Sequence, residues 1–256
     1  MSGENAPSEI QGKKTFFLYP TASVENQIVT ELVQQEFEVY VAKDHARLLR
    51  ALKKYTDSIV FINIDEGMAE PEWEKWIRGM MTALPNVTVG IFSGSNKEEL
   101  QHKYLNDVHV QGGFNSLKVD MSKSIAKVLE TLKNTDAKGR RKYIRANTER
   151  EANATINLPM NGDFVNGTVK DISVVGISCA FDHDPDLKKN ELIKDIQLRL
   201  QTMLLKVEAI VFGSRMDNAD KIYVLLFSQR IDPEVRTKIR KYIQHSLQHK
   251  MDSELK

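Results

Sequence analysis

The pattern of apolar residues changes once along this chain, and the change divides it into two parts of different fold class. Up to about residue 133, short apolar runs alternate with segments whose apolar residues recur every three or four positions, the period of an amphipathic helix. Beyond about residue 150, apolar and polar residues alternate singly in a series of short runs, which is the pattern of half-buried strands. A chain of 256 residues is long enough for two domains, each with its own core.

The first part predicts a doubly wound α/β layer fold. A helical pattern follows each of five apolar runs, and the third run is apolar almost throughout, as expected at the middle of a parallel sheet. Such strand and helix alternation places helices on both faces of the sheet. The strands are predicted at 15–19, 38–42, 58–64, 88–92 and near 108–114, and the helical stripes at 24–33, 46–55, 73–84, 100–105 and 121–132.

The second part predicts a six-stranded antiparallel barrel, because its short runs follow one another with no helix between them. Asp232 and Pro233 then begin a last helix, with proline in the first turn, and its apolar stripe is expected to pack over the barrel. The strands are predicted around 154–158, 165–169, 177–181, 196–200, 205–211 and 222–227, and the stripe consists of Val235, Ile239, Tyr242, Ile243 and Leu247.

The domain boundaries follow from composition. Residues 1–13 are polar and rich in small residues, which predicts a disordered lead, and 14–133 form the α/β domain. The stretch from Lys133 to Gly139 is polar and contains a helix breaker, so we expect a linker at 134–150 and the barrel with its helix at 151–250.

The predicted linker carries three arginines, Arg140, Arg141 and Arg145. Residues four apart fall on the same side of a helix or an extended chain, so Arg141 and Arg145 can converge on one object. Guanidinium groups bond bidentately to phosphate oxygens or to the guanine edge and stack on aromatic rings. The linker therefore predicts a site for a guanine nucleotide with exposed phosphates, with a solvated basic linker as the alternative.

A second polar group follows in Asp171, Ser173 and Gly176. Asp171 and Ser173 are two apart, so on a strand they point to one face, and glycine allows a sharp turn after them. The alternative is turn chemistry, in which both side chains bond nearby backbone amides.

Together, Arg141-Lys-Tyr-Ile-Arg145 and Asp171-Ile-Ser-Val-Val-Gly176 resemble the paired signature of PilZ domains, the bacterial receptors for cyclic di-GMP. The family pattern is RxxxR on a flexible segment followed by D/N-x-S-x-x-G on an early barrel strand. This sequence matches it without a departure, over about 138–250. The resemblance implies cyclic di-GMP as ligand, one or two molecules per chain, with the second stacked on Arg140. It also implies a role in motility, surface polysaccharide or virulence.

The first part resembles a response-regulator receiver domain. In receivers a phosphorylatable Asp ends the third strand, and an acidic pair after the first strand holds Mg²⁺. Asn63 and Tyr19-Pro20 stand at those positions here. An amide cannot accept a phosphoryl group, so a pseudoreceiver that serves as a docking surface is expected. Asp65 is kept as an alternative phospho-acceptor.

Composition excludes several function classes. The formal net charge of +1 gives no global basic field for nucleic acid or membranes, and no apolar run approaches the roughly 20 residues of a membrane span. The start of the chain lacks the pattern of a signal peptide, and the single Cys179 excludes an internal disulfide and a cysteine metal site, so cytoplasmic localisation is predicted. No metal set, cofactor motif or nucleophile with its base can be assembled, which predicts a protein that is not an enzyme.

These observations predict a cytoplasmic cyclic di-GMP receptor that uses Arg140, Arg141, Arg145, Asp171, Ser173 and Gly176. Ligand binding is expected to order the linker and change the domain arrangement, which signals to an unidentified protein partner. Two alternatives stay open: an interaction protein that binds no ligand, and a phosphorylation-controlled regulator acting through the first domain.

Overall fold

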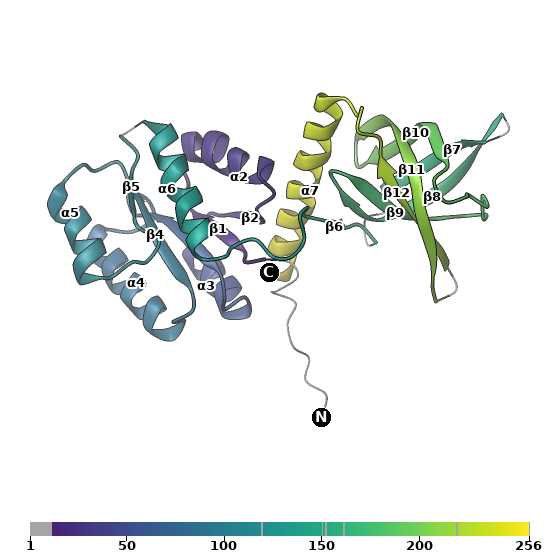
Figure 1. The fold of residues 1–256 in the computed structure, drawn as a ribbon. Helices are drawn as coiled ribbons and strands as arrows, with labels where there is room; N and C mark the ends of the chain where they lie inside the picture. Colours follow the sequence, from purple (N-terminus) through teal and green to yellow (C-terminus); the bar gives the residue numbers. More distant parts are fainter. Residues whose placement is uncertain are drawn as a thin grey trace. The chain divides into compact units, whose positions relative to one another are not determined.

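The computed structural model describes residues 12–118, 120–149, 151, 153–160, 162–218 and 220–255. They form two compact units, shown in Figure 1. The first contains residues up to Lys142 together with those from Gln248 onward, and the second is Tyr143–Leu247. Most of the predicted lead, 1–11, lies outside the described residues, while the backbone N–H of Lys13 donates to the Ala137 carbonyl at 2.9 Å.

The first unit is built on a five-stranded parallel sheet in the order β2-β1-β3-β4-β5. This is the doubly wound order in which the chain reverses direction after β2, as in flavodoxin-like folds. The predicted α/β layer fold is confirmed, and β3 is buried along its whole length. The strands are β1 (Thr15–Leu18), β2 (Val39–Ala42), β3 (Ile59–Asn63), β4 (Thr88–Ser93) and β5 (Phe114–Ser116).

The last strand of this sheet differs from its predicted position near 108–114. Val108 and Val110 are buried as expected, but they lie in a loop where His109 takes a φ of 63°, and β5 begins only at Phe114. Their apolar character reflects burial of the loop and not strand formation.

Helices cover both faces of the sheet (Figure 1). The side chains of Val24, Ile28 and Leu32 pack with those of Val128 and Leu132 against one face. Two helices begin with an aspartate whose side chain accepts a first-turn N–H, which satisfies a donor that the helix itself leaves unpaired. The helical elements are η1 (Val24–Val29) with α2 (Thr30–Gln34), α3 (His45–Lys54), α4 (Glu70–Ala83), α5 (Glu98–His102) with η2 (Lys103–Asp107), and α6 (Met121–Asn134).

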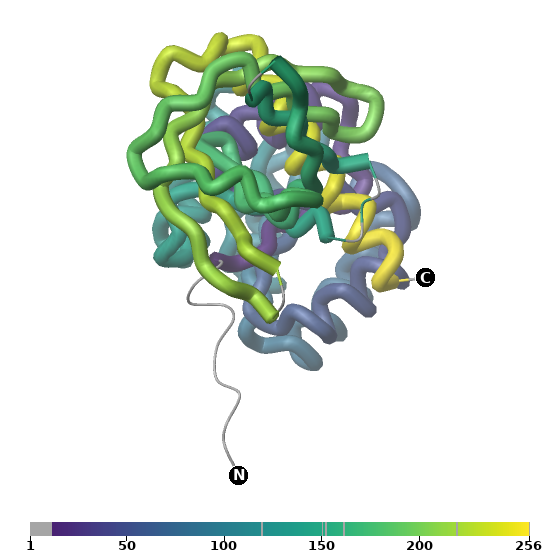
Figure 2. Tube along the Cα trace, turned by 90° about the vertical axis from the view of Figure 1, so that its right-hand side faces the viewer, coloured from purple at the N-terminus to yellow at the C-terminus, as the bar shows by residue number. Residues whose placement is uncertain are grey.

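The second unit is a closed antiparallel barrel, as predicted. Six strands follow in the order β8-β7-β10-β11-β12-β9, and a further pairing of β8 with β9 closes the ring. These strands belong to the green to yellow-green part of the chain in Figure 2. A short extra strand, β6 (Ala146–Asn147), pairs with β8 and was not predicted. The six are β7 (Ala154–Met160), β8 (Asp163–Ser173), β9 (Gly176–Phe181), β10 (Leu192–Leu200), β11 (Met203–Asp217) and β12 (Asp220–Phe227).

The last helix, α7 (Pro233–Glu254), begins where predicted, with the Asp232 carboxylate accepting the Glu234 N–H at 2.7 Å. Ile239, Tyr242 and Ile243 of its apolar stripe are part of the barrel core.

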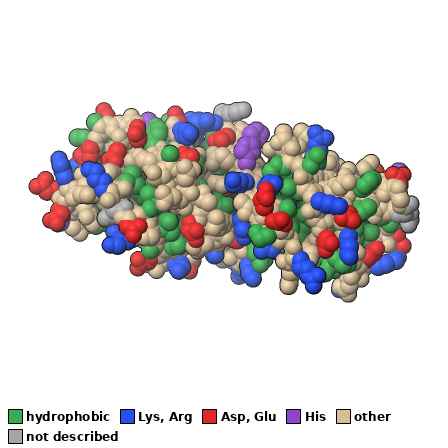
Figure 3. Space-filling model, turned by 90° about the horizontal axis from the view of Figure 1, so that it is seen from above, with side chains coloured by type: hydrophobic (Ala, Val, Ile, Leu, Met, Phe, Trp, Pro, Cys, Tyr) green, Lys and Arg blue, Asp and Glu red, His purple; other side chains and the backbone are tan. Residues whose placement is uncertain are grey.

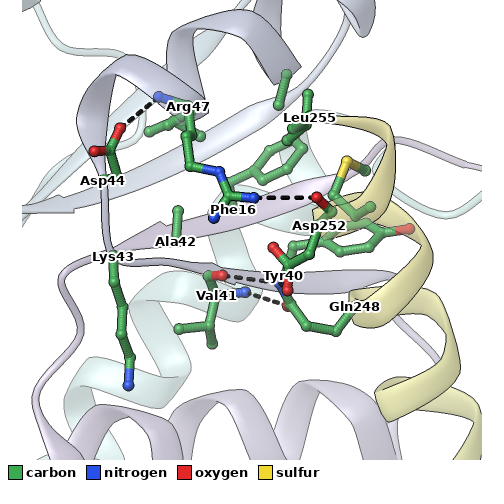
Figure 4. Close-up of a pocket in the computed structure, with 13 residues that line it drawn as sticks. Phe16, Tyr40, Val41, Ala42, Lys43, Asp44, Arg47, Gln248, Asp252 and Leu255 are labelled. Atoms are coloured by element: carbon green, nitrogen blue, oxygen red, sulfur yellow. Dashed lines mark hydrogen bonds between the residues drawn. The ribbon is translucent and has the colours of Figure 1, made fainter.

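The end of α7, from Gln248, belongs to the first unit. The Gln248 side chain accepts the Val41 N–H at 2.9 Å and donates to the Val41 carbonyl at 3.0 Å, which satisfies backbone groups of the edge strand β2. Arg47 donates to the Asp252 carbonyl at 3.1 Å, and Met251 is buried beside them. Figure 4 shows these residues around a pocket of about 330 Å³.

None of the described helices is long and apolar enough to cross a membrane. On the face drawn in Figure 3, acidic and basic side chains are interspersed, in keeping with the small net charge.

Candidate functional site

The predicted linker is held at both ends. Ala137 is buried in the first unit and Lys138 lies over the Phe37 ring, 4.8 Å from its centroid. On the barrel side, Thr148 is buried, and it donates to β8 through its N–H (Lys170 carbonyl, 2.9 Å) and its hydroxyl (Val169 carbonyl, 2.6 Å). The stretch 139–145 between these anchors carries all three arginines.

Arg145 is placed beside the barrel by β6. Because Asn147 pairs with Asp171 across the ladder, the residues just before β6 run along the end of β8. The Arg145 guanidinium lies 3.7 Å from Asp171 Oδ1, with side chains 52% and 27% exposed. A long, solvated ion pair of this kind contributes little to stability, so both groups can exchange it for a ligand at small cost.

Asp171 is also oriented from within the barrel. Its other carboxylate oxygen accepts the hydroxyl of Ser178, which is buried on β9 directly opposite. The ladder shifts register between Val169 and Asp171, so a bulge precedes the carboxylate. Bulges commonly redirect a side chain near binding sites. Ser178 therefore holds the carboxylate in position while Oδ1 stays beside Arg145.

Ser173 is turned into the hairpin. Its side chain is only 4% exposed, its hydroxyl donates to the Gly176 carbonyl at 3.2 Å, and the same oxygen accepts the Val175 N–H at 3.4 Å. This is the turn chemistry that the sequence left open as the alternative. Ser173 thus stabilises the connection from β8 to β9.

Gly176 is required for a reason different from the predicted sharp turn. Its φ is not positive, so its backbone does not need glycine. A Cβ at this position would lie 2.3 Å from the Leu225 carbonyl oxygen and 3.2 Å from Leu226. Glycine is needed because β12 passes very close to β9 at this point.

Arg140 and Arg141 are exposed and belong to the first unit. Of the predicted site residues, the described contacts therefore bring Arg145 and Asp171 together. Ser173 and Gly176 lie at the hairpin that connects β8 to β9.

The sequence did not point to Ser178, whose hydroxyl bonds the Asp171 carboxylate. A two-residue connection at 174–175 fixes the register and sets position 178 opposite 171, so this signal was present in the sequence.

The barrel geometry agrees with the comparison to protein families. The family model described as "PilZ domain" matches residues 139–245. Residues 139–245 are a PilZ domain. The matched range begins at the first residue of the arginine-bearing stretch and ends within α7, so the family model covers Arg140, Arg141 and Arg145, although Arg140 and Arg141 belong to the first structural unit.

Solved structures similar to this chain include proteins in complex with c-di-GMP and a response regulator. The PilZ domain with c-di-GMP of YcgR from Escherichia coli is 14% identical over 45% of this chain and 96% of that one, with a TM-score of 0.37. The K. pneumonia MrkH-c-di-GMP complex is 17% identical over 46% and 57%, with a TM-score of 0.41. A response regulator from Thermotoga maritima is 15% identical over 48% and 98%, with a TM-score of 0.40. No curated protein sequence matches this chain.

The carboxyl edge of the first unit's sheet, where a receiver would hold its phosphorylation site, is filled by a structural network. Asn63 is 2% exposed, its amide donates to the Tyr19 carbonyl at 2.9 Å, and its oxygen accepts the Asp65 N–H at 3.2 Å. The exposed Asp65 accepts the Ser93 hydroxyl at 2.7 Å and the Gly94 N–H. Within the described part of the chain, no group of three or more His, Cys, Asp or Glu side chains could hold a metal ion.

Cys179 lies in the PilZ barrel core. Its side chain is fully buried, and burial raises the pKa of the thiol, with a smaller contribution from the Asp171 charge. The thiol is therefore a packing group and not a nucleophile.

Proposed function

We propose that this protein is a cyclic di-GMP receptor whose PilZ domain binds the dinucleotide on the outer face of β8 and β9. The observation that carries the proposal is the pairing of Arg145 with Asp171 inside a PilZ domain: a cation and an anion that are both solvent-accessible and are positioned by β6 and Ser178. The similar structures of the YcgR PilZ domain and of MrkH both contain c-di-GMP, which supports the same ligand class here.

The two charges suit complementary parts of a guanine nucleotide. The Arg145 guanidinium donates to acceptors, which are the phosphate oxygens and the guanine O6 and N7 edge. The Asp171 carboxylate accepts from N–H groups, which guanine carries on the opposite edge. Arg141 would reach the ligand when the stretch 139–145 closes over it, and Arg140 would stack on a second nucleotide. Ser173 and Gly176 contribute by shaping the hairpin under the ligand.

The role of the receptor is to report the ligand to another protein. Ligand binding orders the arginine-bearing stretch, and the resulting change in domain arrangement is read by an unidentified protein partner in the cytoplasm. The first domain, which lacks a phosphorylatable residue at position 63, serves as the docking surface.

Calorimetric titration of the full chain with cyclic di-GMP tests this proposal. GTP and cyclic di-AMP are the controls. GTP shares the guanine base with cyclic di-GMP but is not a cyclic dinucleotide, whereas cyclic di-AMP has the cyclic dinucleotide backbone but carries adenine. Saturable micromolar binding of cyclic di-GMP alone is expected. Absence of heat at tens of micromolar protein and ligand would overturn the proposal, and the molar ratio at saturation decides between one and two molecules.

A further inference from the structure

Glu151 is a half-buried carboxylate of the PilZ domain for which ligand binding gives no direct role. It lies between the arginine-bearing stretch and β7, and its two oxygens accept from two side chains of α7: the Tyr242 hydroxyl at 2.7 Å and the Ser246 hydroxyl. Tyr242 and Ser246 are four residues apart, so they lie on one face of the helix, and they are only 2% and 5% exposed. Burial raises the pKa of the Tyr242 hydroxyl, and its hydrogen bond to Glu151 adds to this, so the hydroxyl keeps the proton that it donates.

A short series of hydrogen bonds connects the backbone of Glu151 to the segment that carries Arg145, the proposed ligand-binding arginine. Arg145 precedes β6, and after β6 Thr148 is fixed to β8 by two hydrogen bonds. The Glu151 N–H then donates to the Thr148 carbonyl at 2.8 Å, which closes a turn. Thr148 is therefore hydrogen-bonded both to β8, beside which Arg145 lies, and to the backbone of Glu151.

The Glu151 side chain bonds α7 at Tyr242 and Ser246, shortly before the last turns of the helix. Ile239, Tyr242 and Ile243 pack in the barrel core, while the residues from Gln248 belong to the first unit. Ser246 is two residues before Gln248, whose amide is bonded to Val41. A change at Tyr242 and Ser246 therefore occurs next to the point where α7 leaves the PilZ domain.

We propose that Glu151 is a positioning residue that couples the ligand-gripping stretch to helix α7, so that ligand binding at Arg145 is transmitted to the helix through Glu151, Tyr242 and Ser246. This inference rests on the proposed function and adds to it the route by which binding is reported. Two observations support the route: the carboxylate is bonded at both oxygens to one helix, and its backbone is bonded to the turn that follows β6.

Hydrogen exchange of the full chain, measured with and without saturating cyclic di-GMP, tests the coupling. In the wild-type protein the ligand is expected to slow exchange of the α7 amides around 242–248 about fivefold or more, which is the size of a typical coupling between two sites. Glu151→Ala removes the acceptor, and the double variant Tyr242→Phe, Ser246→Ala removes the donors while keeping the packing. Glu149→Ala, an exposed carboxylate on the same segment, is the matched control.

The ligand-induced difference, and not the absolute exchange rate, is the diagnostic quantity, because a purely structural role would change the rates with and without ligand equally. We expect the difference in α7 to vanish in Glu151→Ala and in the double variant, to persist in Glu149→Ala, and to return in Glu151→Gln, whose amide oxygen can still accept. Persistence of the difference in the double variant would overturn the coupling even if Glu151→Ala failed to fold. A wild type that binds the ligand without any change in α7 would also overturn it. A wild type that does not bind cyclic di-GMP contradicts the proposed function instead.

Discussion

The carboxyl edge of the first unit's sheet and the outer face of the PilZ barrel both present polar side chains, but they use them differently. Asn63 is 2% exposed, and its donor and acceptor both bond to backbone groups of the fold. Arg145 and Asp171 keep 52% and 27% of their side-chain surface exposed and share one long contact of 3.7 Å. A polar group whose hydrogen bonds are all made inside the fold stabilises it, whereas one that keeps accessible bonding capacity can bind a ligand.

The same contrast separates members of one sequence motif. Asp171 is accessible, while Ser173 is buried and bonded within the hairpin, although the two are only two residues apart. The bulge before Asp171 and the turn after Ser173 make the difference. Motif membership alone therefore does not assign a residue to the ligand.

The largest effect is expected on ligand affinity when an accessible guanidinium is removed. Each charge-assisted contact is worth about 1.5 to 3 kcal/mol, so Arg145→Ala or Arg141→Ala should weaken cyclic di-GMP binding by roughly tenfold to more than a hundredfold. Both side chains are exposed, so the melting temperature should stay the same. Calorimetry checks the affinity, with Arg199→Ala on an exposed barrel position as control. Wild-type affinity in both arginine variants would show that these exposed guanidinium groups do not bind the ligand. The contrast between an accessible binding face and a structural sheet edge would then fail.

At the sheet edge, the corresponding change should affect stability and not binding. Asn63→Asp replaces the amide donor by a carboxylate at a position that is only 2% exposed, and the loss of its hydrogen bond to the Tyr19 carbonyl costs about 1 to 3 kcal/mol. Urea unfolding should show this loss, while Asn106→Asp at an exposed position of the same unit should be neutral. Acyl-phosphate labelling of Asn63→Asp should remain absent, because Tyr19 and Pro20 offer no carboxylate for Mg²⁺. Labelling of the wild-type chain at Asp65 would instead favour the phosphorylation-controlled alternative.

The fold could be predicted from the sequence where periodicity reports burial directly. The strand and helix repeats other than β5, and the six barrel strands, left a pattern in the sequence, because β1 and β3 are buried along their whole length and most other elements bury one face. The prediction was wrong for β5, since Val108 and Val110 are buried from a loop and give the same apolar signal as a strand. β6 was missed because two residues are too few to show a period.

For the site, the sequence could identify the residue types but not which of them remain accessible. That distinction depends on the register of β8 against β9 and on the close approach of β12 to Gly176, which are properties of the closed barrel. The assignment of the end of α7 to the first unit was likewise not visible, because Gln248 contacts β2 through a polar side chain that gives no hydrophobic signal.

A smaller effect is expected for Ser173→Ala, which tests whether the buried serine of the Asp171 to Gly176 motif has a structural role while Asp171 has a ligand-binding one. Loss of the hydroxyl removes its bonds to Gly176 and Val175, so the free energy of unfolding of the barrel should fall by about 1 kcal/mol. Affinity for cyclic di-GMP should fall less than in Asp171→Ala, because the Ser173 side chain is buried and bonds only to backbone groups of the hairpin. Calorimetry and urea unfolding on both variants check this. A loss of affinity in Ser173→Ala as large as that in Arg145→Ala would mean that the serine turns outward to contact the ligand.

The smallest effect is expected at Asp184, a barrel carboxylate that also lies beside a cation but outside the proposed site. Hydrogen bonds from Tyr223 and Lys221 and the Asp186 N–H lower the pKa of Asp184 to about 2. Since the folded pKa lies below the unfolded value of about 3.9, the ionised group stabilises the fold above that pH, and the contribution is lost as the pH falls to about 2. Asp184→Asn should therefore lower the melting temperature slightly at pH 6 and not at pH 2, and it should leave cyclic di-GMP affinity unchanged. A pH-independent difference in melting temperature would show that packing, and not charge, is what Asp184 contributes, and a loss of affinity would extend the ligand face beyond β8 and β9.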